Sequence, residues 1–357
     1  MFTRKLTSLL AAAAVAAALG ACSQPASSST PTAGSEGSAT ITSSTKLTVV
    51  THDSFALPDE LKAKFAKESG LDVTYVAPGD GGALVNQLIL TKDAPMGDVV
   101  FGIDNSFSGR AVDEGIITDY DSPALPATSK QFDTPDLTPI DFGDVCLNAD
   151  SQWFAKEGIA VPTTLEDLVK PEYKDLLVVT NPASSSPGLS FLLATISAKG
   201  DDGYLDYWGQ LVDNGVKVVQ GWSDAYYTEF SGADGKGPRP LVVSYATSPA
   251  YTVTEDGSES TTVALLGTCF RQVEYAGVIA GAQNQKGAQE FIDFLLSEDV
   301  QSSIPETMYM YPVTDVALPA QWEKFAPLSE QSLTIEPDEI SAGRDRWTKD
   351  WTAKVIG

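Results

Sequence analysis

The architecture of this chain follows from residues 46–82, which read KLTVVTHDSFALPDELKAKFAKESGLDVTYVAPGDGG. The β-branched apolar run 47–51 predicts a strand. The amphipathic segment 58–69 predicts a helix that ends at Gly70, because glycine readily adopts the left-handed conformation found at helix C-termini. Residues 71–77 alternate between apolar and polar side chains, as in a second strand. A strand, a helix and a strand at this spacing predict a parallel βαβ unit.

The same alternation continues beyond this unit. Helices are predicted over 83–91 and 106–114, with a strand over 98–102 between them. In parallel sheets, ligands bind outside the carboxyl ends of the strands. The loops at these ends contain polar residues that we take as candidate ligand-binding residues: Asp53, Asp80 with Gly81, and Asp104.

A second α/β region follows the first. Strands are predicted over 176–179, 216–219 and 241–244, and helices over 188–198, 287–296 and 337–355. The layout suggests two lobes, with chain crossings near 140–146 and 269–275. We therefore expect a first lobe over 46–140, the crossings and a second lobe over 141–274, and a return to the first lobe together with the C-terminal helices over 275–357.

The chain begins with features of an export signal. Arg4 and Lys5 precede an alanine-rich apolar run over 6–19. This run is shorter than the apolar stretch that a transmembrane helix usually needs to span a bilayer. Residues 19–22, Leu-Gly-Ala-Cys, resemble the lipobox of bacterial lipoproteins. This resemblance implies that Cys22 is lipidated and anchors the protein at the outer face of the cytoplasmic membrane. The alternative is an ordinary secretory signal that contains a cysteine.

On this interpretation the signal peptide occupies residues 1–21. The segment 22–45 is rich in Ser, Thr, Ala, Gly and Pro, so it predicts a disordered tether before a folded part that starts near Lys46. The two remaining cysteines, Cys146 and Cys269, lie one in each chain crossing. Outside the cytoplasm an isolated pair most simply forms a disulfide, which we expect to join the crossings beside the hinge.

Composition excludes several classes of protein. The 357 residues carry a formal charge of −25, whereas nucleic-acid binding needs clustered Lys and Arg. The surplus of acid suits a cationic ligand, but it also serves the solubility of an exported protein. A single histidine, His52, excludes metal sites built from two or more imidazoles. The chain has no Gly-x-Ser-x-Gly elbow, P-loop or Cys-x-x-Cys motif, so we expect neither catalysis nor a resident metal or cofactor.

Aromatic residues occur in loops after the predicted strands. Trp222, Tyr245 and Tyr251 follow strands of the second region, and Tyr309 lies in the C-terminal part. Aromatic faces beside carboxylates such as Asp53 suit a flat or permanently charged cation. The same side chains are also consistent with burial in a core.

Several segments, in order, resemble bacterial extracellular solute-binding proteins of ABC importers and, within that family, its thiamine-binding members. The resemblance covers nearly all of the chain from Lys46 onward. Residues 288–301, AQEFIDFLLSEDVQ, are similar to the family's C-terminal helix signature. The more specific segments are DSF (53–55), GIDN (102–105), SPGL (186–189), GWSDAY (221–226), SYATSPAY (244–251) and MYPV (310–313).

The resemblance implies the type II periplasmic-binding-protein fold, in which two α/β lobes joined by a two-strand hinge close on a ligand. It implies thiamine, or its mono- or diphosphate, as the ligand, and a membrane permease with its ATPase as the partner. We expect a monomer that touches the membrane only through its lipid anchor. At matching positions the implied pocket consists of Asp80, Gly81, Ser185, Ser186, Trp222, Tyr245, Ala246, Thr247, Ser248 and Tyr251.

Three positions depart from the family's pattern. His52 and Tyr309 stand where the family often has a tyrosine and a tryptophan, and Ala246 replaces a hydroxyl residue. Ferric-ion-binding proteins share the fold and use adjacent tyrosinates, so the pair Tyr226 and Tyr227 leaves iron(III) as an alternative ligand. A lipid-anchored adhesin or enzyme on the same scaffold is a further alternative.

Overall fold

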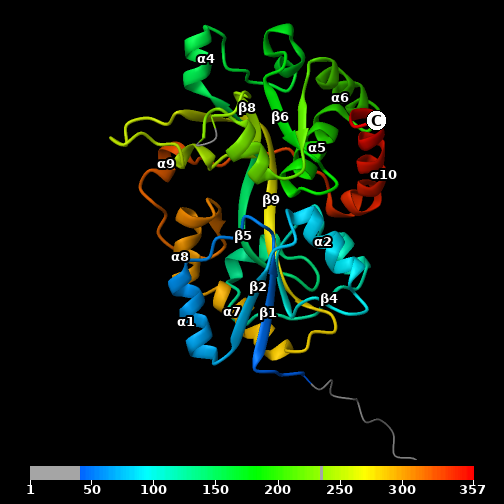
Figure 1. Cartoon of the computed structure of the whole chain (residues 1–357), viewed down its shortest axis with the longest axis vertical. Coiled ribbons are helices and arrows are strands. Elements are labelled where there is room, and N and C mark those ends of the chain that lie inside the picture. Colours follow the sequence, from blue (N-terminus) through cyan, green and yellow to red (C-terminus); the bar gives the residue numbers. More distant parts are fainter. Residues whose placement is uncertain (1–40, 234–235) are drawn as a thin grey trace, which may run out of the picture. The chain divides into compact units, whose positions relative to one another are not determined.

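One ten-stranded mixed sheet runs through residues 41–233 and 236–357, the part of the chain that this computed structural model describes. Its strands lie in the order β2 (Asp72–Val76), β1 (Lys46–Thr51), β3 (Val99–Asp104), β9 (Thr262–Ile279), β5 (Thr138–Asp150), β8 (Leu241–Tyr245), β6 (Leu177–Thr180) and β7 (Lys217–Val219). Two short strands lie off this path, with β4 (Ile117–Thr118) on β9 and β10 (Tyr311–Pro312) on β5. The order places β9 and β5 between a first half (β2, β1, β3) and a second half (β8, β6, β7) (Figure 1).

The first half is parallel, as the βαβ spacing predicts, with β1 hydrogen-bonded between β2 and β3. The predicted helix terminator is confirmed, because Gly70 ends the first helix with a φ of +70°. Alternate side chains of β3 enter two different hydrophobic cores, Val100 and Ile103 in one and Val99 and Phe101 in the other. Both faces of this strand are therefore covered. The helices of this half are α1 (Asp59–Ser69), α2 (Gly81–Leu90) and α3 (Ser108–Asp113).

In the second half, β8, β6 and β7 are also parallel, which confirms the strands predicted there. Its helices are α4 (Ser151–Glu157), α5 (Ser186–Lys199) and α6 (Tyr204–Asp213). Short helical turns of the chain span Ala127–Phe132, Asp167–Val169, Pro171–Tyr173, Asp224–Glu229 and Ser248–Ala250. The residues of α5 are buried from its start at Ser186 through Ile196, so this helix is part of the core.

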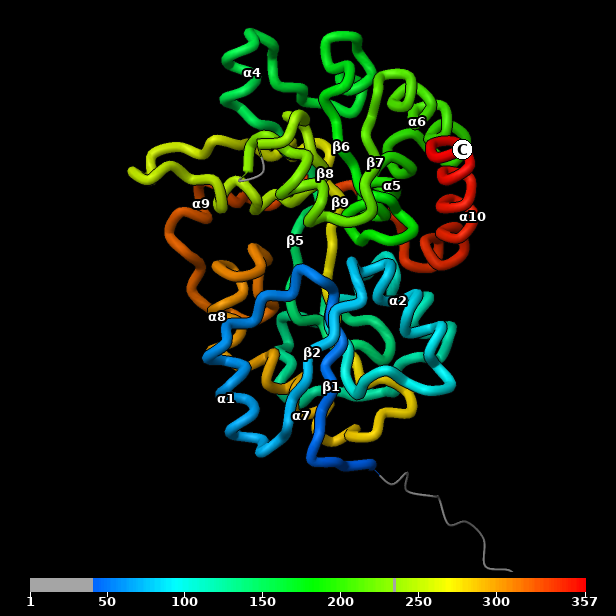
Figure 2. Tube along the Cα trace, in the orientation of Figure 1, coloured from blue at the N-terminus to red at the C-terminus, as the bar shows by residue number. Residues whose placement is uncertain are grey.

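The long strands β5 and β9 connect the two halves. They pair antiparallel along most of their length, and Figure 2 shows both traces passing between the halves. These strands are the crossings that the sequence predicts near 140–146 and 269–275. A disulfide joins Cys146 on β5 to Cys269 on β9, and both residues are completely buried. The predicted disulfide is thus confirmed.

After β9 the chain forms α7 (Gln285–Leu295), α8 (Glu298–Thr307), α9 (Trp322–Phe325) and α10 (Pro337–Val355). α7 packs on β1, β3 and α1 of the first half. α10 is the last of the predicted C-terminal helices. It packs on α6, where Trp351 meets Trp208 edge to face with ring centroids 5.3 Å apart, and it also contacts α3. Burial of Trp347 and Trp351 draws this helix to the second half.

The signal peptide over 1–21, the lipidation site Cys22 and most of the tether over 22–45 lie outside the described residues. Near the end of the tether, the hydroxyl of Thr42 donates to the carbonyl of Ala282 at 2.9 Å. Of the helices that the structure describes, none is both long and apolar enough to cross a membrane. Residues from 41 onward cluster as one compact unit, so the expected lobe boundaries stay a prediction.

Replacing both cysteines, Cys146→Ala with Cys269→Ala, should lower the free energy of unfolding by about 5 kcal/mol in the chain-entropy model of disulfide stabilisation. The reason is that the bond joins residues 123 positions apart and restricts the unfolded chain. Urea unfolding followed by tryptophan fluorescence measures the change. As a control, Leu90→Ala at an 80% exposed position should shift the free energy by less than about 0.5 kcal/mol. Equal stability of the double variant and the parent would contradict a structural role for the bond.

Candidate functional site

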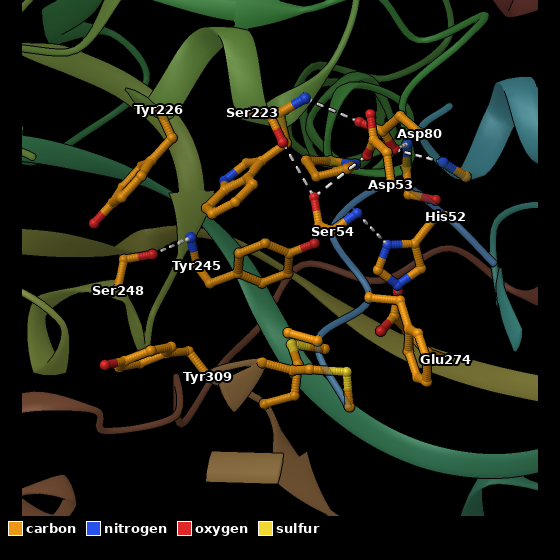
Figure 3. A pocket seen from close by; sticks show the side chains of 18 of the residues that line it. His52, Asp53, Ser54, Asp80, Ser223, Tyr226, Tyr245, Ser248, Glu274 and Tyr309 are labelled. Carbon is orange, nitrogen blue, oxygen red and sulfur yellow. Dashed lines mark hydrogen bonds and ion pairs between the residues drawn. The ribbon is translucent and has the colours of Figure 1, made fainter. Parts of the chain in front are cut away.

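A cavity of about 440 Å³ lies where loops of the two halves meet beside β9 (Figure 3). Both halves contribute to its wall, and the volume suits a small organic molecule. Its lining residues are 52–56, 80–81, 186–187, 222–223, 226–227, 245, 248, 251, 274 and 306–310.

The carboxylate of Asp80 joins the two halves at this cavity. Asp80 precedes α2 in the first half and caps it by accepting the backbone N–H of Gly81 at 2.6 Å. From the second half, Oδ1 accepts the N–H of Ser186 at 3.0 Å and Oδ2 accepts the N–H of Trp222 at 2.9 Å. Burial raises the pKa of Asp80, and these N–H donors oppose the shift. Charge-assisted bonds thus hold the start of α2 against the start of α5.

Further hydrogen bonds cross the same boundary. They join the N–H of Ala83 to the carbonyl of Ser184 at 3.0 Å, Asn86 Nδ2 to the carbonyl of Ala183 at 3.2 Å, and the hydroxyls of Ser54 and Ser223 at 3.3 Å. Because these bonds and those of Asp80 use groups from both halves, the halves are in direct contact at the rim of the cavity.

Trp222 forms a fixed aromatic wall with its neighbours. Its indole N–H donates to Ser244 Oγ at 2.9 Å, and that hydroxyl lies 2.8 Å from Ser248 Oγ. The indole stacks on Tyr226 with ring centroids 4.9 Å apart and meets Tyr245 edge to face at 6.2 Å. The hydrogen bond and the stacking fix the orientation of the indole, which gives the cavity an aromatic surface suited to a flat cationic ring.

Tyr309 lies in the cavity wall in an uncommon backbone conformation. Its φ is +54°, a left-handed value that costs a non-glycine residue about 1–2 kcal/mol. The hydroxyl of Thr247 donates to its carbonyl, and its ring packs edge to face on Tyr251 at 5.3 Å. These contacts compensate the strain and present the Tyr309 side chain to the cavity.

A buried acidic group lies on the β9 side of the cavity. Glu274 faces His52, with Nε2 and Oε1 3.6 Å apart, and accepts from Gln272 Nε2 at 3.2 Å. Burial opposes the charge of Glu274, yet His52, Asp141 and Gln272 hold its pKa below the ordinary value. Asp141 is the residue of β5 that pairs with Glu274, and burial together with Glu274 raises the pKa of Asp141 well above its usual range. The arrangement favours a neutral Asp141 beside a charged Glu274.

The cavity wall carries a surplus of negative charge. Its lining includes the carboxyl groups of Asp53, Asp80, Glu274 and Glu306, and among the described lining residues there is no lysine or arginine. His52 is the one lining side chain that can become positive. A cation is therefore the charge type that this wall complements.

The structure brings most of the predicted ligand-binding residues together. Those that line the cavity are Asp53, Asp80, Gly81, Ser186, Trp222, Tyr245, Ser248, Tyr251 and Tyr309. The others do not line it: Asp104, Ser185, Ala246 and Thr247.

The side chain of Asp104 bonds to the turn that precedes α3, and the side chain of Ser185 caps α5. Asp104 Oδ1 accepts the backbone N–H of Ser106 at 2.7 Å, and burial raises the pKa of Asp104 to about 6. Ser185 is the cap of α5, where its hydroxyl accepts from Gly188 at 3.4 Å and donates to Thr180 Oγ1 at 2.9 Å. The sequence shows that such residues follow strands, but a helix cap and a ligand contact share that signature.

Ala246 and Thr247 are both completely buried. Ala246 packs in a small cluster with Cys146 and Cys269. The hydroxyl of Thr247 donates a hydrogen bond to the carbonyl of Tyr309. Both therefore support the cavity wall from behind instead of facing the cavity.

Sequence reasoning missed Glu274 as a cavity residue. The available signal was the crossing segment 269–275, CFRQVEY, which places Gln272 and Glu274 two positions apart in a strand expected to be buried. A charged residue in such a strand needs a buried partner or a ligand. Tyr226 and Tyr227, the pair that leaves iron(III) as an alternative ligand in the sequence, both line the same cavity.

The cavity complements an organic cation better than a metal ion. Burial raises the pKa of Tyr226 and Tyr245, so both phenols are neutral in the cavity. Within the described ranges, no three His, Cys, Asp or Glu side chains lie close enough to hold a metal. Stacked rings beside carboxylates favour an organic cation over a bare ion.

Comparison with known proteins defines the class. The family of bacterial extracellular solute-binding proteins matches residues 94–334, well over half of the chain. The chain therefore belongs to this family. It is accordingly an exported protein that binds a solute for transport, and it is not an enzyme.

Individual relatives agree with this class. The chain is 32% identical over 320 residues to the thiamine-binding periplasmic protein of Escherichia coli (strain K12), covering 87% of this chain and 93% of that protein. A solved structure described as a periplasmic thiamin binding protein matches with a TM-score of 0.76 and 30% identity over 87% of this chain and 96% of the other. A ferric binding protein from Campylobacter jejuni shares the fold alone, at 16% identity and a TM-score of 0.68, over 86% and 99% of the two chains. The expected type II periplasmic-binding-protein fold is thus confirmed.

The substitution Asp80→Asn should lower the free energy of unfolding by about 1–3 kcal/mol. In the parent, each carboxylate oxygen accepts a backbone N–H, from Ser186 or from Trp222. In the variant, the amide NH₂ group replaces one of these oxygens, so one N–H loses its acceptor. Urea unfolding measures the loss. The control Asp202→Asn removes an exposed carboxylate and should change the free energy by less than about 0.5 kcal/mol. If both variants have the same free energy of unfolding as the parent, the bonds from Asp80 to Ser186 and Trp222 do not stabilise the contact between the halves.

Proposed function

We propose that this protein captures thiamine in the cavity and delivers it to an ABC permease. The observation that carries the proposal is a single cavity that combines the fixed aromatic wall at Trp222 with four carboxyl groups and, among its described lining residues, no lysine or arginine. The similarity to thiamine-binding relatives over most of the chain supports the same ligand.

The two rings of thiamine match the two aromatic surfaces of the cavity. The thiazolium ring carries a permanent positive charge, and a cation over an aromatic face such as Trp222 or Tyr245 gains about 0.5–2 kcal/mol. Tyr251 and Tyr309 provide a second surface on which the aminopyrimidine can stack. Asp53 at the exposed rim offers a carboxylate acceptor for the amino group.

The proposal extends to thiamine monophosphate and diphosphate, with the phosphate directed toward Gly81 and Ser186. Backbone N–H groups at the starts of α2 and α5 favour an anion there. However, Asp80 already accepts the N–H groups of both residues. We therefore expect the phosphorylated forms to bind no more tightly than thiamine itself.

The remaining steps of the proposed function concern delivery. Lipidated Cys22 anchors the protein to the outer face of the cytoplasmic membrane, and the segment 22–45 acts as its tether. The protein works as a monomer whose two halves together present a surface to the permease, while the ATPase acts inside the cell. The chemistry of the ligand does not change during capture.

Calorimetric titration of the purified protein, unfolded and refolded to remove carried-over ligand, tests the proposal. Thiamine should bind one to one, and Trp222→Ala should weaken binding by about 1–2 kcal/mol, a five- to thirtyfold rise in Kd, through loss of the aromatic wall. Separate titrations with thiamine monophosphate and diphosphate give the order of affinities.

The matched control is Trp153→Ala, which removes a half-buried tryptophan that does not line the cavity. Its Kd for thiamine should stay within a factor of two of the parent's. If folded parent protein gives no heat of binding with any of the three ligands, thiamine and its phosphates are excluded as ligands. The assignment to the class of solute-binding proteins would still hold. An unchanged Kd for Trp222→Ala would place the ligand away from the indole.

A further inference from the structure

The single histidine of the chain faces a buried carboxylate inside the cavity. His52 Nε2 lies 3.6 Å from Glu274 Oε1, and the two side chains are only 12% and 8% exposed (Figure 3). On the other side of the ring, Nδ1 accepts the backbone N–H of Ser54 at 3.2 Å. A neutral His52 therefore carries its proton on Nε2, directed at Glu274, and a charged one places a full positive charge there.

Packing holds the imidazole in this position. Gly102 has a φ of +99°, and a Cβ at this residue would lie 2.2 Å from His52 Cδ2, so the ring rests against the backbone of β3. The ring of Phe101 lies on the same strand, with its centroid 5.6 Å from that of the imidazole. His52 thus remains beside Glu274 whether or not it carries a charge.

We propose that Glu274 is the counter-ion of the ligand's positive charge and that protonated His52 competes with the ligand for it. The inference rests on the proposed function, since it assumes a cationic ligand in this cavity. A buried carboxylate without a positive partner is costly, so either the imidazolium or the thiazolium will satisfy Glu274. Two positive charges beside one carboxylate repel each other, so capture of the ligand is coupled to release of a proton from His52.

The groups around the pair are acidic on every side. Burial alone would lower the pKa of His52, but Glu274 first, and then Asp80 and Asp53, raise it above its ordinary value. The titratable groups facing the pair are Asp53 on the same loop, Asp80 at the start of α2, Asp104 on β3, Asp141 on β5 and Tyr245 on β8. Among the described residues of the cavity wall, only His52 supplies a positive charge.

The sign of the pH dependence follows from this competition. Without ligand the pKa of His52 is raised, and the bound cation pushes it down. Affinity therefore rises with pH between the two pKa values and is constant outside that interval. A fall of one pKa unit on binding corresponds to about a tenfold change in Kd.

Titration calorimetry with thiamine at pH 6, 7 and 8 tests the coupling. For the parent protein, Kd should fall about tenfold from pH 6 to pH 8, and titrations in buffers of different ionisation enthalpy should show proton release over this range. His52→Gln should remove most of this slope. Asp104, whose pKa burial raises to about 6, accounts for any slope that remains at the acidic end.

Glu274→Gln tests the counter-ion directly. It should raise Kd at least tenfold at pH 8 and also remove most of the pH slope, because His52 and the ligand then no longer share this carboxylate. The matched control Glu114→Gln removes an exposed carboxylate paired with Lys92, away from the cavity, and should keep both the affinity and the slope.

Nuclear magnetic resonance gives an independent readout on the unaltered protein. Since the chain has one histidine, a single imidazole signal reports the pKa of His52, with and without saturating thiamine. The pKa should fall when thiamine binds. Tight thiamine binding with the same Kd at pH 6 and pH 8 and an unmoved imidazole pKa would overturn this inference and leave the proposed function intact. Folded protein that binds no thiamine at any pH would overturn the proposed function itself.

Discussion

The pairing of β5 with β9 is the constraint on which the rest of the structure depends. Each strand serves both halves, since β9 also pairs with β3 and β5 also pairs with β8. The buried Cys146–Cys269 disulfide also ties the two strands, so the connection between the halves is covalently reinforced. The loops that follow β1, β2 and β8 then meet beside β9, and a cavity forms there because the strands direct their carboxyl ends to it.

The charge of the cavity follows from the same arrangement. β9 carries Glu274 into the cavity wall, and β5 places Asp141 directly opposite it. Two carboxyl groups this close do not both ionise, so Asp141 stays neutral while Glu274 keeps its charge beside His52. Asp80 satisfies its own charge with N–H groups from both halves. A wall with excess negative charge and fixed aromatic faces is what a permanently charged, flat ligand requires.

Most of the fold could be predicted from local sequence patterns. The segments 47–51, 58–69 and 71–77 form a strand, a helix and a strand as their periodicity indicates, because burial of one face selects the same period in the sequence and in the structure. The exception is α10, where the amphipathic pattern predicts a helix but not its partner. Only the tertiary structure brings Trp351 onto Trp208, since a contact between segments so far apart in the chain leaves no local pattern in the sequence.

The sequence by itself determined the α/β class, the crossing strands, the cysteine pair and the residue types around the cavity, because these depend on local periodicity, composition and motifs. It also pointed to Trp222, Tyr245 and Asp80, which follow strands. Only the tertiary structure decided which way side chains face. It turned Asp104 toward the turn before α3 and Ser185 toward the start of α5, and it brought Glu274 from a distant strand to His52. The physical reason is that a polar residue at a strand end is satisfied equally well by a helix terminus or by a ligand, and only the packing of distant segments selects between them.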